Sequence, residues 1–192
     1  MDIIKKSSVG IQSLPLDAML LSQRIIFLTE EITTNSATEI LKQLLFLESE
    51  DTSEPIKLII NSPGGQVSAG LMLYDQLKSM TVPVDLYCVE LAASMAAVIL
   101  AGGKPGHRFI LKHSKVMIHE PFITAGGVGG NASSVQKTAE SILETKRTLV
   151  ELLAQDTGRS VEEIQESLSY DNYMNAEGAI AFGICDGIVD RV

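Results

Sequence analysis

The chain has 192 residues, 45% of them hydrophobic, and its 24 acidic residues outnumber 15 basic ones to give a formal net charge of −9. This length and composition predict one globular domain with a substantial core. The acidic balance, the absence of tryptophan and the aromatic content of 5% argue against a nucleic-acid partner, which needs clustered basic residues or stacking aromatic side chains.

A few further features bear on compartment and cofactors. Cys88 and Cys185 both lie in apolar stretches, which predicts reduced core residues rather than a disulfide or a metal site. The three histidines are far from both cysteines and show no metal-ligand spacing. No apolar run reaches the roughly 20 residues that span a bilayer, and the N-terminus lacks a secretory signal pattern. We therefore expect a cytoplasmic protein with no metal and no membrane partner.

The first half of the chain alternates expected strands and helices. Residues 1–20 have little pattern, and the stretch from Lys5 to Gly10 suggests a mobile lead-in. Hydrophobic periodicity and β-branched content then predict a strand at 24–28, a helix from 35 or 36 to about 47, a charged loop at 48–55, a strand at 56–60, a helix at about 67–80 and a strand at 84–89. Consecutive strand–helix units predict right-handed crossovers and a mainly parallel sheet, hence an α/β fold.

The turn Asn61-Ser62-Pro63-Gly64-Gly65 joins the second expected strand to its helix. Paired glycines adopt backbone angles closed to other residues and leave their amides uncovered by side chains. Uncovered amides before a helix form an anion-binding nest, although an ordinary strand-to-helix turn is the alternative interpretation.

The stretch from Cys88 to Gly103 predicts the end of a buried strand and then a short helix that is apolar on every side. Ser94 is the only hydroxyl in this helix and falls in its first turn, beside amides that have no intrahelical partner. Ser94 is therefore a candidate nucleophile, with an N-cap or a small buried serine as the alternative. Because sites in parallel α/β folds gather at the carboxyl ends of strands, we expect Ser94 and the Gly64-Gly65 turn on one rim.

A candidate base follows in the next pair of strands, expected at 108–111 and 115–118. His119 comes directly after the second of them, again at the carboxyl end of a strand. A hydrogen-bonded structural histidine is the alternative interpretation. His107 and His113 fall in turns and are expected to be solvated.

The last third of the chain is mainly helical. A glycine-rich stretch at 124–131 precedes a long amphipathic helix expected from about Ala132 to Asp156 and ended by Gly158. Its apolar stripe predicts core packing, although a helix this long and hinged on glycines is also typical of an arm that packs on another subunit. A short helix opened by the Ser160 capping box, a turn at 171–174, a helix at 175–183 and a strand at 187–189 complete a single domain.

Four short motifs occur in a fixed order between about residues 24 and 189: Ile60-Asn61-Ser62-Pro63-Gly64-Gly65, Ala92-Ala93-Ser94-Met95, Met117-Ile118-His119 before Pro121, and Asp171 followed by Ala176-Glu177. Together they resemble the proteolytic subunit of Clp proteases, a serine peptidase of the crotonase-like superfold. The resemblance implies repeated strand–helix units in one domain over 1–192. It also implies a protruding handle at about 122–157, made of the glycine-rich segment and the long helix, after a divergent segment at 1–23.

The resemblance assigns Ser94 as nucleophile, His119 as general base and Asp171 as the acid that orients the imidazole. Nucleophilic catalysis by a serine requires the same three kinds of group, because the hydroxyl needs a base to take its proton and the imidazole needs a third group to fix its tautomer. The sequence by itself does not select Asp171 over Asp156 or Asp186; the resemblance does.

The resemblance also implies the groups that hold the substrate. The backbone amides of Gly65 and Met95 match the family's oxyanion hole, which stabilises the tetrahedral intermediate. The substrate is expected to lie as an extended strand, bound through its backbone, beside Gly64 and a second stretch formed by Ala125, Gly126, Gly127 and Val128.

The family's assembly supplies the expected partners. Its members stack two seven-membered rings into a barrel with the serines inside, and an AAA+ unfoldase feeds unfolded polypeptides through the axial pores. That unfoldase uses ATP, so no cofactor is expected in this subunit. The resemblance thus implies an ATP-dependent serine endopeptidase that assembles with itself as a tetradecamer.

The chain departs from the family pattern at several positions. Around the serine, Glu90 and Ala96 stand where glycines are usual, and Glu120 replaces a glutamine beside the base. Ser169-Tyr170 replaces an acidic-arginine pair that couples the rings. In the pocket where the unfoldase docks, the usually aromatic positions hold Lys57, Ile59 and Ser79. A second hypothesis is therefore a weakly active paralogue that serves as a structural or regulatory subunit of a mixed barrel with a second Clp proteolytic subunit. A third is an acyl-CoA hydratase or isomerase of the same superfold, which uses an oxyanion hole but typically a glutamate acid/base.

Overall fold

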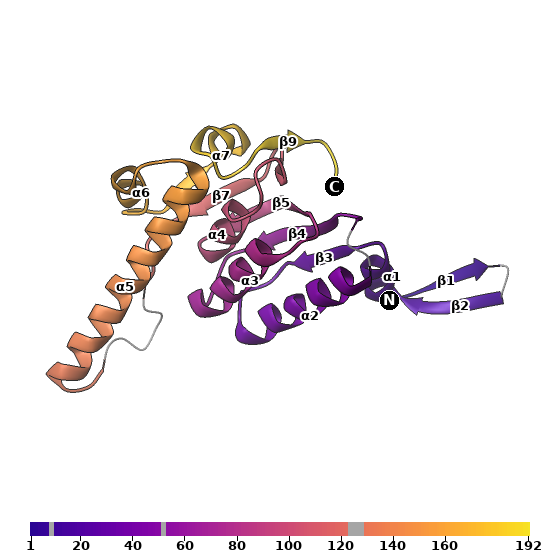
Figure 1. The fold of residues 1–192 in the computed structure, drawn as a ribbon, viewed down its shortest axis with the longest axis horizontal. Helices are drawn as coiled ribbons and strands as arrows, with labels where there is room; N and C mark the ends of the chain where they lie inside the picture. The colour runs from indigo at the N-terminus through magenta and orange to yellow at the C-terminus, as the bar shows by residue number, and fades with distance from the viewer. Residues whose placement is uncertain (8–9, 51–52, 123–128) are drawn as a thin grey trace.

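The structure, a computed structural model, describes residues 1–7, 10–50, 53–122 and 129–192. Strands and helices alternate over most of this length (Figure 1). The elements are β1 (Asp2–Ser7), β2 (Gly10–Pro15), α1 (Leu16–Ser22), β3 (Ile25–Leu28), α2 (Thr34–Glu50), β4 (Ile56–Ser62), α3 (Val67–Ser79), β5 (Val84–Ala93), α4 (Met95–Ala101), β6 (Arg108–Leu111), β7 (Lys115–Ile118), α5 (Ala132–Thr157), α6 (Val161–Ser167), β8 (Asn172–Met174), α7 (Ala176–Phe182) and β9 (Gly187–Val189).

A seven-stranded sheet organises the described part of the chain, in the order β3-β4-β5-β6-β9, with β7 pairing both β5 and β8. Its pairings are parallel except that of β7 with β8. The predicted α/β class with a mainly parallel sheet is therefore confirmed. Strands β6, β7 and β9 begin and end at the residues expected from the sequence.

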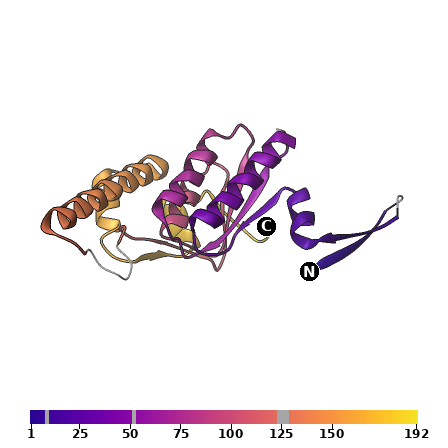
Figure 2. The same cartoon turned by 90° about the horizontal axis from the view of Figure 1, so that it is seen from below.

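Helices α2 and α3 lie side by side over one face of this sheet (Figures 1 and 2). The alternate strand residues that face these helices, such as Leu58, Ile60 and Leu86, are fully buried. Helix α4 packs between α3 and β5, and each of its residues is buried, as its all-round apolar sequence predicts. The core therefore lies between the sheet and these helices, and it fixes the strand ends that carry the site.

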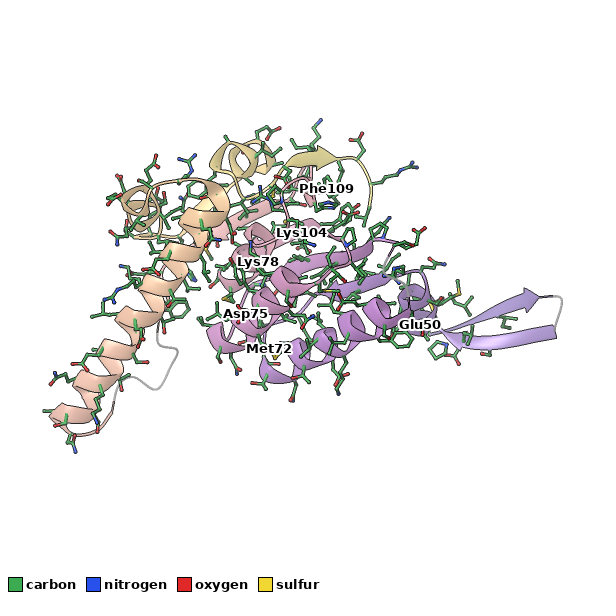
Figure 3. All side chains as sticks on the ribbon, viewed as in Figure 1. Glu50, Met72, Asp75, Lys78, Lys104 and Phe109 are labelled. Atoms are coloured by element: carbon green, nitrogen blue, oxygen red, sulfur yellow. The ribbon has the colours of Figure 1, made fainter. Side chains whose placement is uncertain are left out.

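The opposite face of the sheet is only partly covered. Phe27 and Ile188 are 45% and 39% exposed, and between their strands the Tyr87 and Phe109 rings stack with centroids 5.2 Å apart. Lys57 lies over the Tyr87 ring, 5.9 Å from its centroid. Phe109 is labelled on its strand in Figure 3. Aromatic side chains are thus present on this face beside Lys57.

Three local expectations were wrong. The first residues, for which no regular element was expected, contain β1 and β2, which pair antiparallel, and α1 follows directly. Helix α2 continues to Glu50, into the expected loop, because Leu47 still packs in the core. The expected turn at 171–174 is mostly strand β8.

His107 is not simply solvated, since its Nδ1 lies 2.6 Å from the Asp85 carboxylate. His113 is exposed as expected, and Cys88 and Cys185 are both buried free thiols. Burial raises the pKa of the Cys88 thiol to about 12, so this sulfur stays protonated and unreactive at neutral pH. Among the residues that the structure describes, no helix has the length and hydropathy to cross a bilayer.

Helix α5 projects from one end of the sheet and the β1–β2 hairpin from the other (Figure 1). Against the described residues, only the C-terminal half of α5 is anchored, through the buried residues Leu149, Val150 and Leu153. In its N-terminal half the apolar stripe is uncovered, with Val135 39% and Leu143 61% exposed. The expected core packing therefore holds for half of the helix, and the arm interpretation fits the other half.

A buried arginine ties together the ends of several elements behind the site. Arg108 on β6 is 6% exposed. Its guanidinium donates to the carbonyls of Ala101, Asp156 and Gly183 at 2.9–3.1 Å. It also donates to both carboxylate oxygens of Asp186, at 3.0 and 2.6 Å. The ends of α4, α5 and α7 are thus joined to the sheet through one side chain.

The pairing with Arg108 predicts a pH-dependent contribution to stability. Burial alone would raise the pKa of Asp186, but hydrogen bonds and charge from Arg108 outweigh it, so this pKa lies below its ordinary value. We expect Asp186→Asn to lower the free energy of unfolding by about 1–3 kcal/mol at pH 7, because a charge-assisted pair becomes a neutral one. Chemical denaturation at equal protein concentration measures this difference.

The sign of the pH effect follows from the lowered pKa. The contribution is fully present above the pKa of an unfolded aspartate, about 4, and is lost as the pH falls through the lower folded value. Wild type and Asp186→Asn should therefore converge in stability as the pH drops below about 4. Asp75→Asn, at an exposed position on α3 labelled in Figure 3, is the matched control and should change little. A gap between Asp186→Asn and wild type that stays constant down to pH 2.5 would contradict the ionic role.

Candidate active site

Parallel pairing of β5 with β7 brings Ser94 next to His119. The register pairs Ala93 with Met117, and the Ser94 amide continues it by donating to the Met117 carbonyl at 2.8 Å. Ser94 follows the last residue of β5, and His119 follows the last residue of β7. The two side chains therefore emerge from neighbouring strands at their carboxyl ends, as expected from the sequence.

Antiparallel pairing of β7 with β8 brings in Asp171. In this register Ile118 pairs with Asn172. His119 directly follows β7, and Asp171 directly precedes β8. In an antiparallel pair these two residues therefore also lie opposite each other. The sheet register thus places three side chains in a row although 77 positions separate the outer two in sequence.

The three side chains form one hydrogen-bonded chain. Nε2 of His119 lies 2.9 Å from Ser94 Oγ, and Nδ1 of His119 lies 2.9 Å from Asp171 Oδ1. Both contacts are satisfied when Nδ1–H donates to the carboxylate and the Ser94 hydroxyl donates to Nε2. The His119 side chain is 15% exposed, whereas that of Asp171 is 66% exposed in the isolated chain. The imidazole is therefore held at both nitrogens, in an arrangement able to accept the serine proton.

Ser94 occupies a sharp turn between β5 and α4. Its φ of 54° and ψ of −123° lie outside the regions that residues other than glycine favour. It stands at the N-cap position of α4, but its side chain makes no capping hydrogen bond and instead contacts His119. The cap interpretation is thus contradicted. A strained strand-to-helix turn of this kind presents a hydroxyl to solvent at the end of a sheet.

The glycine turn after β4 packs directly against the serine. A Cβ on Gly64 would lie 2.7 Å from the Ser94 Cβ and 3.0 Å from the Met95 amide nitrogen, and one on Gly65 would lie 2.2 Å from the Ile32 carbonyl. Their φ angles of 93° and 148° are also in the region that favours glycine. Side chains are therefore excluded at both positions, and the main chain approaches Ser94 closely.

Two amides beside Ser94 have no acceptor within the described residues. Ile32 bonds to the carbonyl of Gly64 and the amide of Gln66, which leaves the Gly65 amide out of that bridge. The Met95 amide, at the first position of α4, likewise donates to none of the described groups. Gly65 and Met95 thus supply two open main-chain donors near the hydroxyl.

An open cleft and a small enclosed cavity both reach the serine. Val67, Ser94, His119 and Pro121 line both of them. The cavity is otherwise apolar, lined by Met95, Val98, Ile118, Leu149, Leu153 and Leu168. The cleft is lined by Glu31, Pro63, Gly64, Gly65, Gln66 and Phe122 as well. An extended chain bound in this cleft would thus present one of its bonds to Ser94.

Two residues that closely follow His119 in the sequence, Glu120 and Phe122, make contacts beside it. The Phe122 ring meets the imidazole edge to face, with centroids 5.2 Å apart. Glu120 forms an ion pair with Lys146 of α5, and its amide donates to the Leu168 carbonyl at 2.9 Å. The negative charge of Glu120 is therefore directed to α5 and not left free beside the imidazole.

The sequence did not predict some residues of the cleft, and some residues that it did predict lie outside the described part of the chain. Phe122 could have been proposed, because it stands three residues after His119. Glu31 carried no signal, because only the bridge between Ile32 and Gly65 brings it to the cleft. Of the predicted substrate-binding residues, Gly64 lines the cleft. The other predicted residues, Ala125, Gly126, Gly127 and Val128, lie outside the described residues.

Within the described ranges no three acidic, histidine or cysteine side chains gather in a way that would hold a metal ion. The arrangement at the carboxyl ends of β5 and β7 instead offers a hydroxyl, an imidazole, a carboxylate and open amides. A family model described as Clp protease matches residues 10–192, nearly the whole chain. The chain therefore belongs to the Clp protease family.

Proposed function

We propose that this chain is a serine endopeptidase that hydrolyses unfolded polypeptides with a triad of Ser94, His119 and Asp171. The observation that carries the proposal is the unbroken hydrogen-bonded chain through the three side chains, 2.9 Å at each step, beside two open amides. Membership of a peptidase family supports it independently. A hydratase or isomerase has no need of a serine bonded to an imidazole, so the geometry favours acyl transfer over that alternative.

The first half of the reaction forms an acyl-enzyme. Ser94 Oγ attacks the scissile carbonyl carbon while its proton passes to Nε2 of His119, and Asp171 stabilises the resulting imidazolium. The carbonyl electrons move to the oxygen, where the amides of Gly65 and Met95 hold the negative charge. When the intermediate collapses, the C–N bond breaks, and the proton on Nε2 passes to the leaving amine.

The second half releases the acyl group. A water molecule gives a proton to Nε2 of His119 and its oxygen attacks the ester carbonyl, so the same two amides again hold an oxyanion. Collapse breaks the bond to Ser94 Oγ, and the proton on Nε2 returns to the serine. The open cleft suits this step because water reaches Ser94 once the leaving fragment has diffused away.

Substrate binding is proposed to use the peptide backbone more than side chains. The cleft is walled by the main chain of the Gly64–Gln66 turn, where the absence of side chains lets another strand approach. Backbone pairing holds any extended sequence, which suits a protease whose substrates are unfolded.

Exposed apolar side chains support self-assembly. Leu45 and Phe46 on α2 are 48% and 50% exposed, and Leu143 on α5 is 61% exposed. These side chains are available for contacts with another copy of the chain. We propose that copies of the chain form a barrel of two stacked seven-membered rings, fed by an ATP-driven AAA+ unfoldase. The aligned triad favours an active subunit over a purely structural one in a mixed barrel.

Replacing the nucleophile tests the proposal. Ser94→Ala should abolish cleavage of a short fluorogenic peptide, with a loss of at least about 10⁴-fold, because no other described hydroxyl contacts His119. The sedimentation profile should stay that of wild type, since the substitution removes only the hydroxyl and keeps the Cβ in place. Ser68→Ala, at an exposed serine on α3, is the matched control and should keep full activity. Peptide cleavage by Ser94→Ala at the wild-type rate would reject the assigned nucleophile.

Replacing the orienting acid tests the role of Asp171. Asp171→Asn keeps the size of the side chain but favours the imidazole tautomer that presents N–H to Ser94, so kcat should fall by about 10²–10⁴-fold. Circular dichroism should show an unchanged fold because Asp171 is exposed. Asp190→Asn removes an exposed carboxylate elsewhere and should leave kcat as in wild type. Equal turnover by Asp171→Asn and wild type would remove Asp171 from the mechanism.

A further inference from the structure

The cleft that reaches Ser94 has an unbalanced charge. Glu31 is the one acidic residue among the described residues that line it, and none of those lining residues is a lysine or arginine. The neighbouring acid, Glu120, already pairs with Lys146. No basic residue occurs between Pro121 and Gln136, the segment that follows the cleft in the chain. The described lining of the cleft therefore holds no lysine or arginine that could balance Glu31.

The main chain around Glu31 is fixed. Its carbonyl accepts a hydrogen bond from the Ser36 hydroxyl at 2.9 Å. The next residue, Ile32, is fully buried and bridges to the glycine turn through bonds of 2.7 Å. Glu31 is itself exposed, and its carboxylate takes part in none of the ion pairs of the described residues. A fixed backbone thus holds an unpaired carboxylate at the wall of the cleft.

We propose that Glu31 is a specificity-determining residue, which favours unfolded polypeptides with a lysine or arginine close to the scissile bond. The inference rests on the proposed peptidase function and adds a substrate preference to it. A basic substrate side chain would supply the missing cation, because backbone pairing holds the substrate at a set distance from the cleft wall. Its aliphatic stem would pack on the exposed Phe122 ring, and its charged head would stay in water beside the carboxylate.

The size of the expected effect is modest because the pair is exposed. Ion pairs at protein surfaces change an equilibrium by about two- to fivefold. They are also screened by salt, with a Debye length of about 10 Å at 0.1 M and about 3 Å at 1 M. The preference should therefore be measurable at low ionic strength and should fade at 1 M salt.

The test uses a set of fluorogenic peptides in which a single lysine is moved through three positions on each side of the scissile bond. Each lysine peptide is compared with its glutamine counterpart, and the readout is the ratio of their kcat/KM values. Wild type should favour lysine about two- to fivefold at one position or at two positions on the same face of the extended chain. Glu31→Gln should bring this ratio to about one, and Glu31→Lys should reverse it.

Glu30→Gln is the matched control. Glu30 is the adjacent glutamate, equally exposed, but it lines a different surface hollow together with Phe27 and Thr33. Its removal changes the net charge of the chain by the same amount, so a general electrostatic effect would appear in both variants. The lysine ratio should be that of wild type in Glu30→Gln.

Binding measurements separate this inference from the peptidase assignment. The affinities of labelled lysine and glutamine peptides are measured by fluorescence anisotropy on full-length Ser94→Ala and on Ser94→Ala combined with Glu31→Gln. If wild type cleaves no peptide, the peptidase assignment fails, and the affinity ratio alone decides the role of Glu31. Equal rates and affinities for lysine and glutamine at every position, or a lysine ratio kept in Glu31→Gln, would overturn the inference.

Discussion

The site depends on one strand that changes neighbours along its length. Strand β5 pairs with β6 through Leu86–Cys88 and then with β7 through Leu91–Ala93. The change occurs at Glu90, which adopts a left-handed φ of 68°. Because β7 takes over as neighbour only after this point, its end meets the end of β5, and His119 arrives beside Ser94.

The change of neighbour carries a conformational cost that local bonds offset. A left-handed residue other than glycine costs about 1–2 kcal/mol. At Glu90 the amide donates to the Ser114 hydroxyl at 2.8 Å and the carboxylate accepts from Asn61 at 2.6 Å. Ser94, four residues later, is the second left-handed residue of this segment. Backbone strain is thus concentrated within four residues of the nucleophile, where the surrounding sheet and the buried helix α4 hold the main chain in place.

The parts of the fold that the sequence predicted are those set by local periodicity. Strands β6, β7 and β9 and helix α4 follow from runs of apolar residues that allow few alternatives. The hairpin at the N-terminus was missed because its two strands lack the alternation of a half-buried sheet. Residues that meet only through tertiary pairing, such as Glu31 with the glycine turn, carry no local signal at all. Asp171 could be assigned only by family resemblance, since its partner His119 is 52 positions away.

Helix α5 shows how one regular element serves two environments. At 26 residues it is about 39 Å long, which is more than the short helices α4 and α6 that it packs on can cover. Its last turns place Leu149 and Leu153 in the wall of the cavity beside Ser94, and one turn earlier Lys146 pairs with Glu120. Its N-terminal half exposes Val135 and Leu143 to solvent in the isolated chain.

The polar residues 144–148 interrupt the apolar stripe of α5 and separate its exposed half from its anchored half. A helix does not bend freely between its turns, so contacts made on the exposed half constrain the half that lines the site. The position of the wall beside Ser94 is for this reason tied to the position of the N-terminal half of α5.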